Sequence, residues 1–285
     1  MSSLALKLVA IITMTIDHIG VVYQSMWQYA GLANFMRGVG RIAFPLYIFL
    51  IAEGMRKSKN RQRYLAWLFI FAVISIVPFS LFRGINSSGL LATVQPRFLD
   101  VSTANILFEL FLGALAIFLF DLCRKYITAG RGVAGHVVGL AAPIFCAYLA
   151  HLINVDYTWM GMAAIFATYY IMSFEDNKYL KNLPKEFWRY VRIVPITAWA
   201  IYYYNIHLGS LMRQRIVLPA TFGDVNLEFS VFAAFALIAP LLILLYNGEP
   251  GNAKLRGPFK IWFYIYYPAH LLAIFAFASY LRINQ

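Results

Sequence analysis

Nine stretches of mostly apolar residues, bounded by charged clusters or by Pro, Gly and Asn, divide this chain. The hydrocarbon core of a bilayer is about 30 Å thick, so a helix needs roughly 20 apolar residues to cross it. The fifth and sixth stretches are short and close together, so one of them is a candidate re-entrant segment. The pattern predicts spans near residues 4–24, 34–55, 64–82, 103–122, 137–152, 157–173, 190–212, 229–246 and 260–281.

The composition excludes an ordinary soluble domain. Hydrophobic residues make up 61% of the chain and charged residues 13%, against about 45 to 50% and about 25% in soluble domains. A disordered chain is excluded and no nucleic-acid partner is expected. Cys123 and Cys146 lack disulfide or zinc spacing, and no metal is expected. We predict a single all-α domain, residues 1–285, that is a polytopic membrane bundle of about nine to ten helices embedded in the lipid bilayer.

Lys and Arg residues gather in alternate loops, which predicts the orientation by the positive-inside rule. With a cytoplasmic N-terminus, 17 cations fall in inner segments and 5 in outer ones, the outer ones being Arg83, Arg97, Arg213, Arg215 and Arg282. The basic inner loops are typical of a cytoplasmic face near anionic lipid headgroups. They are also where a phosphorylated donor would be captured.

A few ionisable residues lie inside the predicted spans, where they are costly and are functional candidates by default. Asp17 and His18 are adjacent in the first span, so they point about 100° apart on a helix and His18 needs an orienting partner from elsewhere. Arg41 falls at a similar depth in the second span. An acid, an imidazole and a guanidinium can therefore meet, although His18 could also be a buried histidine bonded to a neighbouring backbone.

Arg37 and Arg41 are four residues apart, hence on one helix face, where like charges repel unless an anion lies between them. We therefore expect the guanidinium of Arg41 to bind Asp17, Glu109, a phosphate or a carbonyl group. Arg37 lies nearer the outer interface, where we expect it to snorkel. Pro45 removes a backbone hydrogen bond one turn after Arg41 and predicts a kink.

Other polar residues in the spans have structural and functional interpretations. Asn105, Glu109 and Gly113 make one face of the fourth span that suits close helix approach; Glu109 is a second carboxylate of the site or, as we favour, the salt-bridge partner of Arg41. His207 follows three tyrosines and is expected to be structural. His270 follows Pro268 and is equally consistent with a cavity residue or a structural one.

The segment Y-N-G-E-P-G, residues 246–251, has the composition of a tight turn. The same Gly-rich backbone could wrap a phosphate or adenine, with Lys254, Arg256 and Lys260 nearby.

Five segments occur in a fixed order along the chain: L-K-L-V-A-I-I-T-M-T-I-D-H-I-G, G-R-I-A-F-P-L-Y-I-F-L-I-A-E-G, N-V-D-Y, Y-N-G-E-P-G and Y-Y-P-A-H-L. In combination, they resemble the TraX family, whose members are inner-membrane acetyltransferases that N-acetylate the first residue of conjugative F-type pilin. The resemblance runs from about residue 4 to residue 275. It implies a multi-pass protein of the bacterial inner (cytoplasmic) membrane, acetyl-CoA as donor and a pilin subunit as acceptor.

A weaker similarity to the transmembrane acyltransferase superfamily implies that His18 matches the catalytic histidine of the first helix. Arg41 with Pro45 matches the acyl-CoA motif of the second. We expect His18 to act as base, Arg41 to hold the thioester carbonyl or pantetheine arm, and Asp17 to tune the pair. The residues expected to bind the donor are Arg41, Pro45, Glu53, Asn247, Gly248, Glu249, Lys254, Lys260 and His270.

Two other functions stay open on the sequence alone. An O-acetyltransferase of an envelope glycan or lipid would use the same chemistry on a hydroxyl group. A proton-coupled transporter could use Asp17, His18, Arg41 and His270 as a relay, although the chain lacks the inverted repeats typical of that class.

Overall fold

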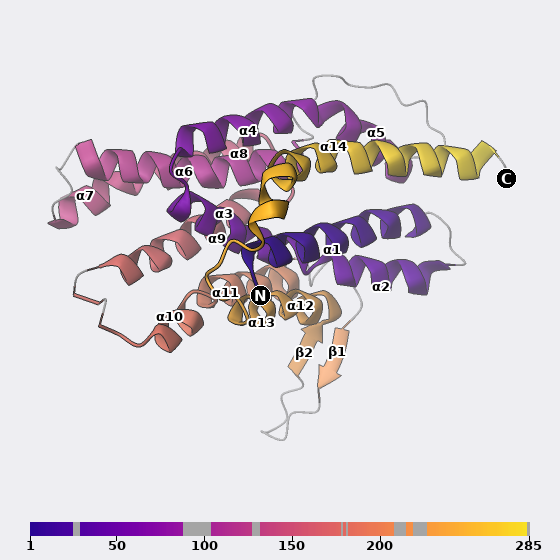
Figure 1. The fold of residues 1–285 in the computed structure, drawn as a ribbon. Coiled ribbons are helices and arrows are strands. Elements are labelled where there is room, and N and C mark those ends of the chain that lie inside the picture. The colour runs from indigo at the N-terminus through magenta and orange to yellow at the C-terminus, as the bar shows by residue number, and fades with distance from the viewer. Residues whose placement is uncertain are drawn as a thin grey trace. The chain divides into compact units, whose positions relative to one another are not determined.

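The structure, a computed structural model, describes residues 1–24, 29–87, 104–126, 132–177, 179–180, 182–207, 215–218 and 227–283 (Figure 1). Most of the expected outer loop at 84–101 lies outside these residues. The cations Arg97, Lys178, Lys181 and Arg213 do as well. The described part of the chain forms two compact units, whose boundary along the sequence falls within helix α3, Ala43–Lys57.

The first unit comprises Met1–Tyr47 and Pro184–Pro250. Helices α1 and α2 pack side by side in it, and α12 packs against α2 (Figure 1). An antiparallel hairpin pairs Arg215 with Ser230 and Leu218 with Leu227. Besides the start of α3, its elements are α1 Ser3–Gln24, α2 Ala30–Gly40, α10 Lys185–Val191, α11 Val194–Ile201, the π-helix Tyr202–His207, β1 Arg215–Leu218, β2 Leu227–Ser230, α12 Val231–Ala236 and α13 Ile238–Leu244.

The second unit comprises Ile48–Leu183 and Gly251–Gln285. Helix α6 lies against α4, α7, α8 and α9, while α14 packs on α4 and α5. Gly113 allows the approach of α6 to α9, because a Cβ there would lie 2.7 Å from Ile165 Cδ1. Its elements after α3 are α4 Arg61–Ile74, α5 Ile76–Ser87, α6 Ile106–Tyr126, α7 Gly132–Gly139, α8 Ala141–Leu152, α9 Thr158–Ser173, a 3-10 turn Phe174–Asp176 and α14 Ala253–Ile283.

Five helical segments are long and apolar enough to cross a membrane, or six if the pair α4 and α5, bent by 42°, counts as one span. They coincide with six of the nine predicted spans. The other three predicted spans form shorter helices, such as the 16-residue α9. The predicted helical membrane fold is thus confirmed for the described residues, with the hairpin as an added element, while the number of spans and the orientation stay predictions.

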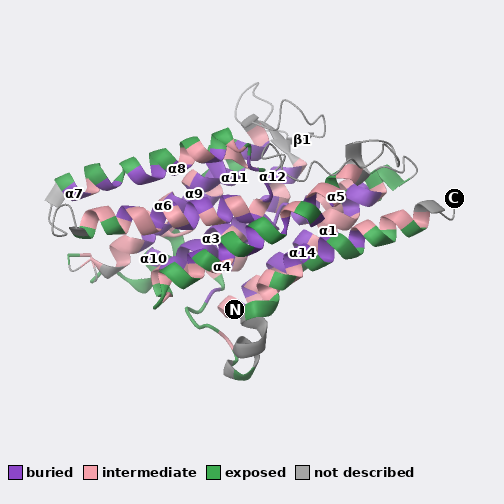
Figure 2. Cartoon of the chain, turned by 90° about the horizontal axis from the view of Figure 1, so that it is seen from above, coloured by how far each residue is buried: buried purple, intermediate pink, exposed green. Residues whose placement is uncertain are grey.

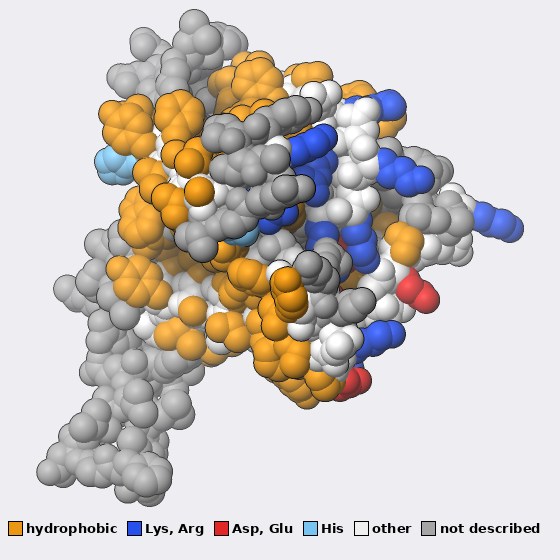
Figure 3. Space-filling view, turned by 90° about the vertical axis from the view of Figure 1, so that its left-hand side faces the viewer, with side chains coloured by type: hydrophobic (Ala, Val, Ile, Leu, Met, Phe, Trp, Pro, Cys, Tyr) orange, Lys and Arg blue, Asp and Glu red, His pale blue; other side chains and the backbone are white. Residues whose placement is uncertain are grey.

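Large apolar side chains on the outer sides of the helices support the membrane assignment. Helix α8 exposes Ile144, Phe145 and Tyr148, each by more than half of its surface, and its exposed side is visible in Figure 2. Hydrophobic side chains also cover much of the face drawn in Figure 3. Apolar side chains of this kind are stable in contact with lipid tails and do not have to be buried against other parts of the protein.

The predicted irregularity before Pro45 is confirmed. Helix α2 ends at Gly40, and a turn at Arg41 and Ile42 precedes α3. Arg41 N–H donates to Gly38 O at 2.9 Å. This bond spans three residues, whereas the bonds of an α-helix span four. Pro45 has no N–H with which to bond the carbonyl of Arg41, so the break places Arg41 at a helix end.

Gly40 lets α2 approach α1 closely, because a Cβ at this position would collide with the side chain of Asp17. Gly31 lies on the same helix, and a Cβ there would meet nothing within 4 Å. We expect Gly40→Ala to destabilise the fold by about 1–3 kcal/mol through overpacking, and Gly31→Ala to leave it unchanged or slightly more stable. Thermal unfolding in detergent measures both effects. Equal melting temperatures of the Gly40→Ala and Gly31→Ala variants would contradict this packing.

Candidate active site

The charged residues of the first two predicted spans come together in the first unit. Helix α1 carries Asp17 and His18, α2 carries Arg37 near its end, and Arg41 is the residue that follows α2. Because Arg37 and Arg41 are one helical turn apart, both guanidinium groups can reach the same side of α1.

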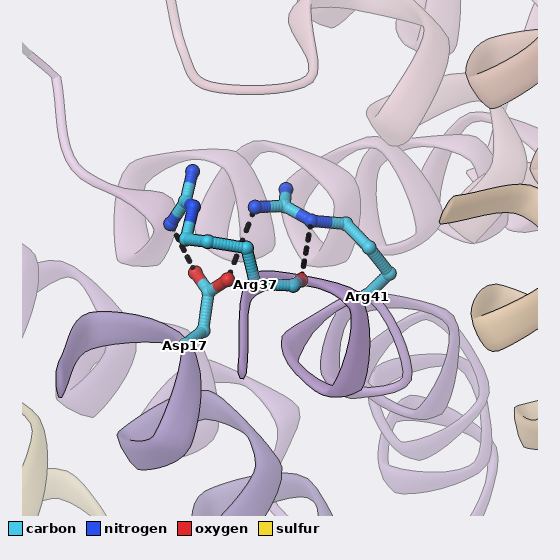
Figure 4. Close-up of polar contacts among 3 residues, drawn as sticks. All are labelled: Asp17, Arg37 and Arg41. Atoms are coloured by element: carbon cyan, nitrogen blue, oxygen red, sulfur yellow. Dashed lines mark hydrogen bonds and ion pairs between the residues drawn. The ribbon is translucent and has the colours of Figure 1, made fainter. Parts of the chain in front are cut away.

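One carboxylate binds both guanidinium groups (Figure 4). Arg37 Nη1 donates to Asp17 Oδ2 at 2.8 Å, and Arg41 Nη2 donates to Asp17 Oδ1 at 3.0 Å. Arg41 Nε also donates to the carbonyl oxygen of Arg37 at 3.1 Å. Asp17, one of the partners considered for Arg41, thus neutralises the repulsion between the two arginines.

The Asp17–Arg37–Arg41 cluster is largely withdrawn from solvent. The side chains of Asp17, Arg37 and Arg41 are 15%, 22% and 10% exposed. The guanidinium of Arg41 lies over the ring of Phe232 in α12, 5.4 Å from its centroid, which adds a cation–π contact. Three hydrogen-bonding and ring contacts therefore orient Arg41, and its donors are positioned before any substrate binds.

The prediction that Arg37 snorkels toward the interface is wrong, because its guanidinium binds Asp17. Gly40 and Phe232 were not predicted as parts of the site. The Gly-Arg pair at 40–41 is a weak signal for a close approach. Phe232 lies 191 residues from Arg41 in an apolar stretch, and nothing in the sequence marks it.

His18 is half-buried on α1, next to Asp17 along the chain. Consecutive residues of a helix point about 100° apart, so the Asp17 carboxylate that holds the two arginines faces a different direction from the imidazole. The same turn of α1 thus carries a carboxylate that is held by two arginines and a half-buried imidazole.

The segment 246–251 forms the predicted tight turn. Asn247 Oδ1 accepts from Glu249 N–H, and Asn247 Nδ2 donates to Glu249 Oε2, each at 3.1 Å. Gly248 and Gly251 adopt φ values of 81° and 94°, which favour glycine.

The turn is also tied to the start of the chain. Asn247 N–H donates to Met1 O at 2.9 Å, and Ser3 N–H donates to Glu249 O at 2.8 Å. The N–H groups of Tyr246, Asn247 and Glu249 are thus used within the protein, and a phosphate here would depend on other donors.

Four residues of the predicted donor site belong to the second unit. Glu53 is buried and binds Lys57 Nζ at 2.7 Å, and His270 Nδ1 lies 2.9 Å from Tyr266 O with its ring stacked on that tyrosine. Lys254 is exposed, and Lys260 lies in α14. Pro45, Asn247, Gly248 and Glu249 belong to the first unit with the cluster of Asp17.

The cations at the end of α3, in the short loop and at the start of α4 are of two kinds, paired and exposed. Arg56 pairs with Glu175, and Arg61 pairs with Asp121, which also accepts from Tyr169. These pairs join the loop to α6, α9 and the turn that follows α9. By contrast, Lys59 and Arg63 are exposed.

Glu109 has a partner other than the arginine that we favoured. Its Oε2 accepts from the backbone N–H of Tyr157 at 3.0 Å. The carboxylate that binds Arg41 is Asp17.

Comparison with known proteins adds two matches. The model of the family described as "TraX protein" matches residues 2–278. A relative in Dichelobacter nodosus, described as "Probable fimbrial assembly protein FimC, serogroup H1", is 27% identical over 286 residues, which cover 99% of this chain and 97% of that protein. No solved structure matches.

Proposed function

Because the chain belongs to the TraX family, we propose that it transfers an acetyl group from cytosolic acetyl-CoA to the N-terminal amine of a pilin subunit. The proposed reaction takes place in the bacterial inner membrane, with the acceptor at its outer side. The observation that carries the proposal is the Asp17–Arg37–Arg41 cluster, which fixes a guanidinium on the part of the chain that also carries His18. The description of the relative as a fimbrial assembly protein supports a pilin as acceptor.

Acetyl transfer needs a base, a group that holds the thioester carbonyl and exclusion of water. His18 is the proposed base, since a neutral imidazole accepts a proton near physiological pH. An α-amine has a pKa of about 8, so it requires only modest help to become nucleophilic.

In the proposed step, His18 takes a proton from the acceptor's ammonium group, and the free amine attacks the thioester carbonyl carbon. The carbonyl oxygen gains negative charge, which Arg41 stabilises as an already oriented donor. The C–S bond then breaks and CoA leaves as the thiolate, which takes up the proton that the attacking nitrogen loses, so that a neutral amide remains on the acceptor. Asp17 acts as a positioning residue, because it holds Arg41 through Nη2.

The donor is proposed to enter from the cytosolic side. Its phosphates would meet the exposed cations Lys59, Arg63 and Lys254. Arg56, Lys57 and Arg61 already bind carboxylates of the protein, so their charges are partly neutralised. The remaining residues proposed to bind the donor are Pro45, Glu53, Asn247, Gly248, Glu249, Lys260 and His270.

Release of free CoA tests this function. Purified protein in nanodiscs is mixed with acetyl-CoA, with and without a peptide that bears a pilin-like N-terminus. We expect CoA release that depends on the peptide. Saturable binding of acetyl-CoA without peptide-dependent release would contradict the pilin acceptor and favour a glycan or lipid hydroxyl, while no binding at all would contradict the acetyltransferase and favour a transporter.

A further inference from the structure

A buried carboxyl group in the second unit has no role in the proposed transfer. The side chain of Glu109 in α6 is 0% exposed. Its Oε2 accepts from Tyr157 N–H, but its Oε1 is buried without a hydrogen-bond partner in the described part of the chain. Burial of an unsatisfied carboxylate oxygen is costly, so a group that binds Oε1 would stabilise the fold.

A second buried oxygen without a described partner lies next along the chain from Tyr157. It is Oγ1 of Thr158, the first residue of α9. Tyr157 N–H donates to the carboxyl of Glu109, so that carboxyl lies at the start of α9, where Thr158 is the first residue. The start of α9 therefore holds two buried oxygen atoms without a described partner.

The surroundings favour a ligand with positive charge. Burial without a counter-charge disfavours a carboxylate, and a bound cation or proton would remove that cost. The charged group that acts on Glu109 is Asp156, an exposed acid that adds a second negative charge.

Among the described residues, the cations on the helices that pack against α6 either lie far from Glu109 or are exposed. In α4, Arg61 pairs with Asp121, which is 12 residues and therefore about 18 Å along α6 from Glu109, and Arg63 is exposed. His151 is exposed at the end of α8, and the ring of His136 in α7 makes an edge contact with Phe120, further along α6.

We propose that Glu109 and Thr158 form a cation-binding site at the start of α9, which takes up a proton or a small alkali cation. Carboxylate and hydroxyl oxygens are the ligands that hard cations prefer. Asp156, an exposed acid next to Tyr157 along the chain, adds negative charge near the carboxyl of Glu109. Binding ties α6 to α9, since Glu109 and Thr158 belong to these two helices.

Thermal unfolding of the purified full-length protein tests the site. One arm replaces choline chloride by NaCl at constant ionic strength and pH, and the other lowers the pH at constant Na⁺. Above half-saturation, we expect the wild-type melting temperature to rise by about 3 °C per tenfold increase in the free concentration of the cation that binds. A response to Na⁺ identifies an alkali cation, and one to pH alone identifies a proton.

Glu109→Gln can still accept from Tyr157 N–H but lacks the charge, so it should lose the response. Thr158→Val retains the branched shape and should weaken it, which keeps the test informative if Glu109→Gln fails to fold. Glu186→Gln, at an exposed carboxyl in α10, should respond as the wild type does. Equal responses of the wild type and the Glu109 and Thr158 variants in both arms would overturn the proposal.

Discussion

Replacement of His18 by alanine is expected to reduce acetyl transfer by about 10²- to 10⁴-fold, the usual contribution of a general base. The half-buried imidazole is not among the residues that form the Asp17–Arg37–Arg41 cluster. The variant should therefore fold and still bind CoA. Peptide-dependent CoA release gives the rate, and calorimetric titration gives the affinity for CoA.

The control for His18 is His151→Ala, at an exposed histidine in α8. It should transfer acetyl at the wild-type rate. A purified His18→Ala variant that retains transfer would remove His18 from the role of base, and a variant that also loses CoA binding would give it a structural role instead.

Asp17→Ala is expected to have the largest effect on stability. It leaves Arg37 and Arg41 side by side without the carboxylate that binds both. Removal of one partner from a buried ion pair costs about 3–5 kcal/mol, and we expect the lower end because the side chains of Asp17 and Arg37 are 15% and 22% exposed. Thermal unfolding in detergent measures the loss.

A double-mutant cycle separates the ion pair from other effects of Asp17. If Asp17 acts through Arg41, then Asp17→Ala combined with Arg41→Leu should cost less than the sum of the two single changes. Asp17→Ala should also weaken acetyl-CoA binding, because Arg41 loses the bond to its Nη2. Additive losses, or unchanged acetyl-CoA binding by a folded Asp17→Ala variant, would contradict the positioning role.

The features that follow from local sequence were predictable. Hydropathy located the membrane helices, since apolar length is a property of each segment alone. The need of Arg41 for a partner followed from two like charges one helical turn apart, although the partner that we favoured, Glu109, was wrong. The irregular turn before Pro45 followed from the missing N–H of proline.

The features that depend on distant contacts were not predictable in this way. The prediction for Arg37 rested on its depth in the span, and depth does not reveal a carboxylate on the neighbouring helix. Phe232 below Arg41 and the bond from Asn247 to Met1 join residues far apart in the sequence. The hairpin at 215–218 and 227–230 has short strands, and its pairing is not visible in hydropathy.

The acetylated atom tests the central claim most directly. Acetyl-CoA labelled with ¹³C in the acetyl group is incubated with the protein and the pilin-like peptide, and the peptide is fragmented in a mass spectrometer. We predict the label on the α-amine of the first residue, with no label on a peptide whose N-terminus is blocked. Label on the blocked peptide, or CoA release without label on either peptide, would contradict N-terminal acetylation by this protein.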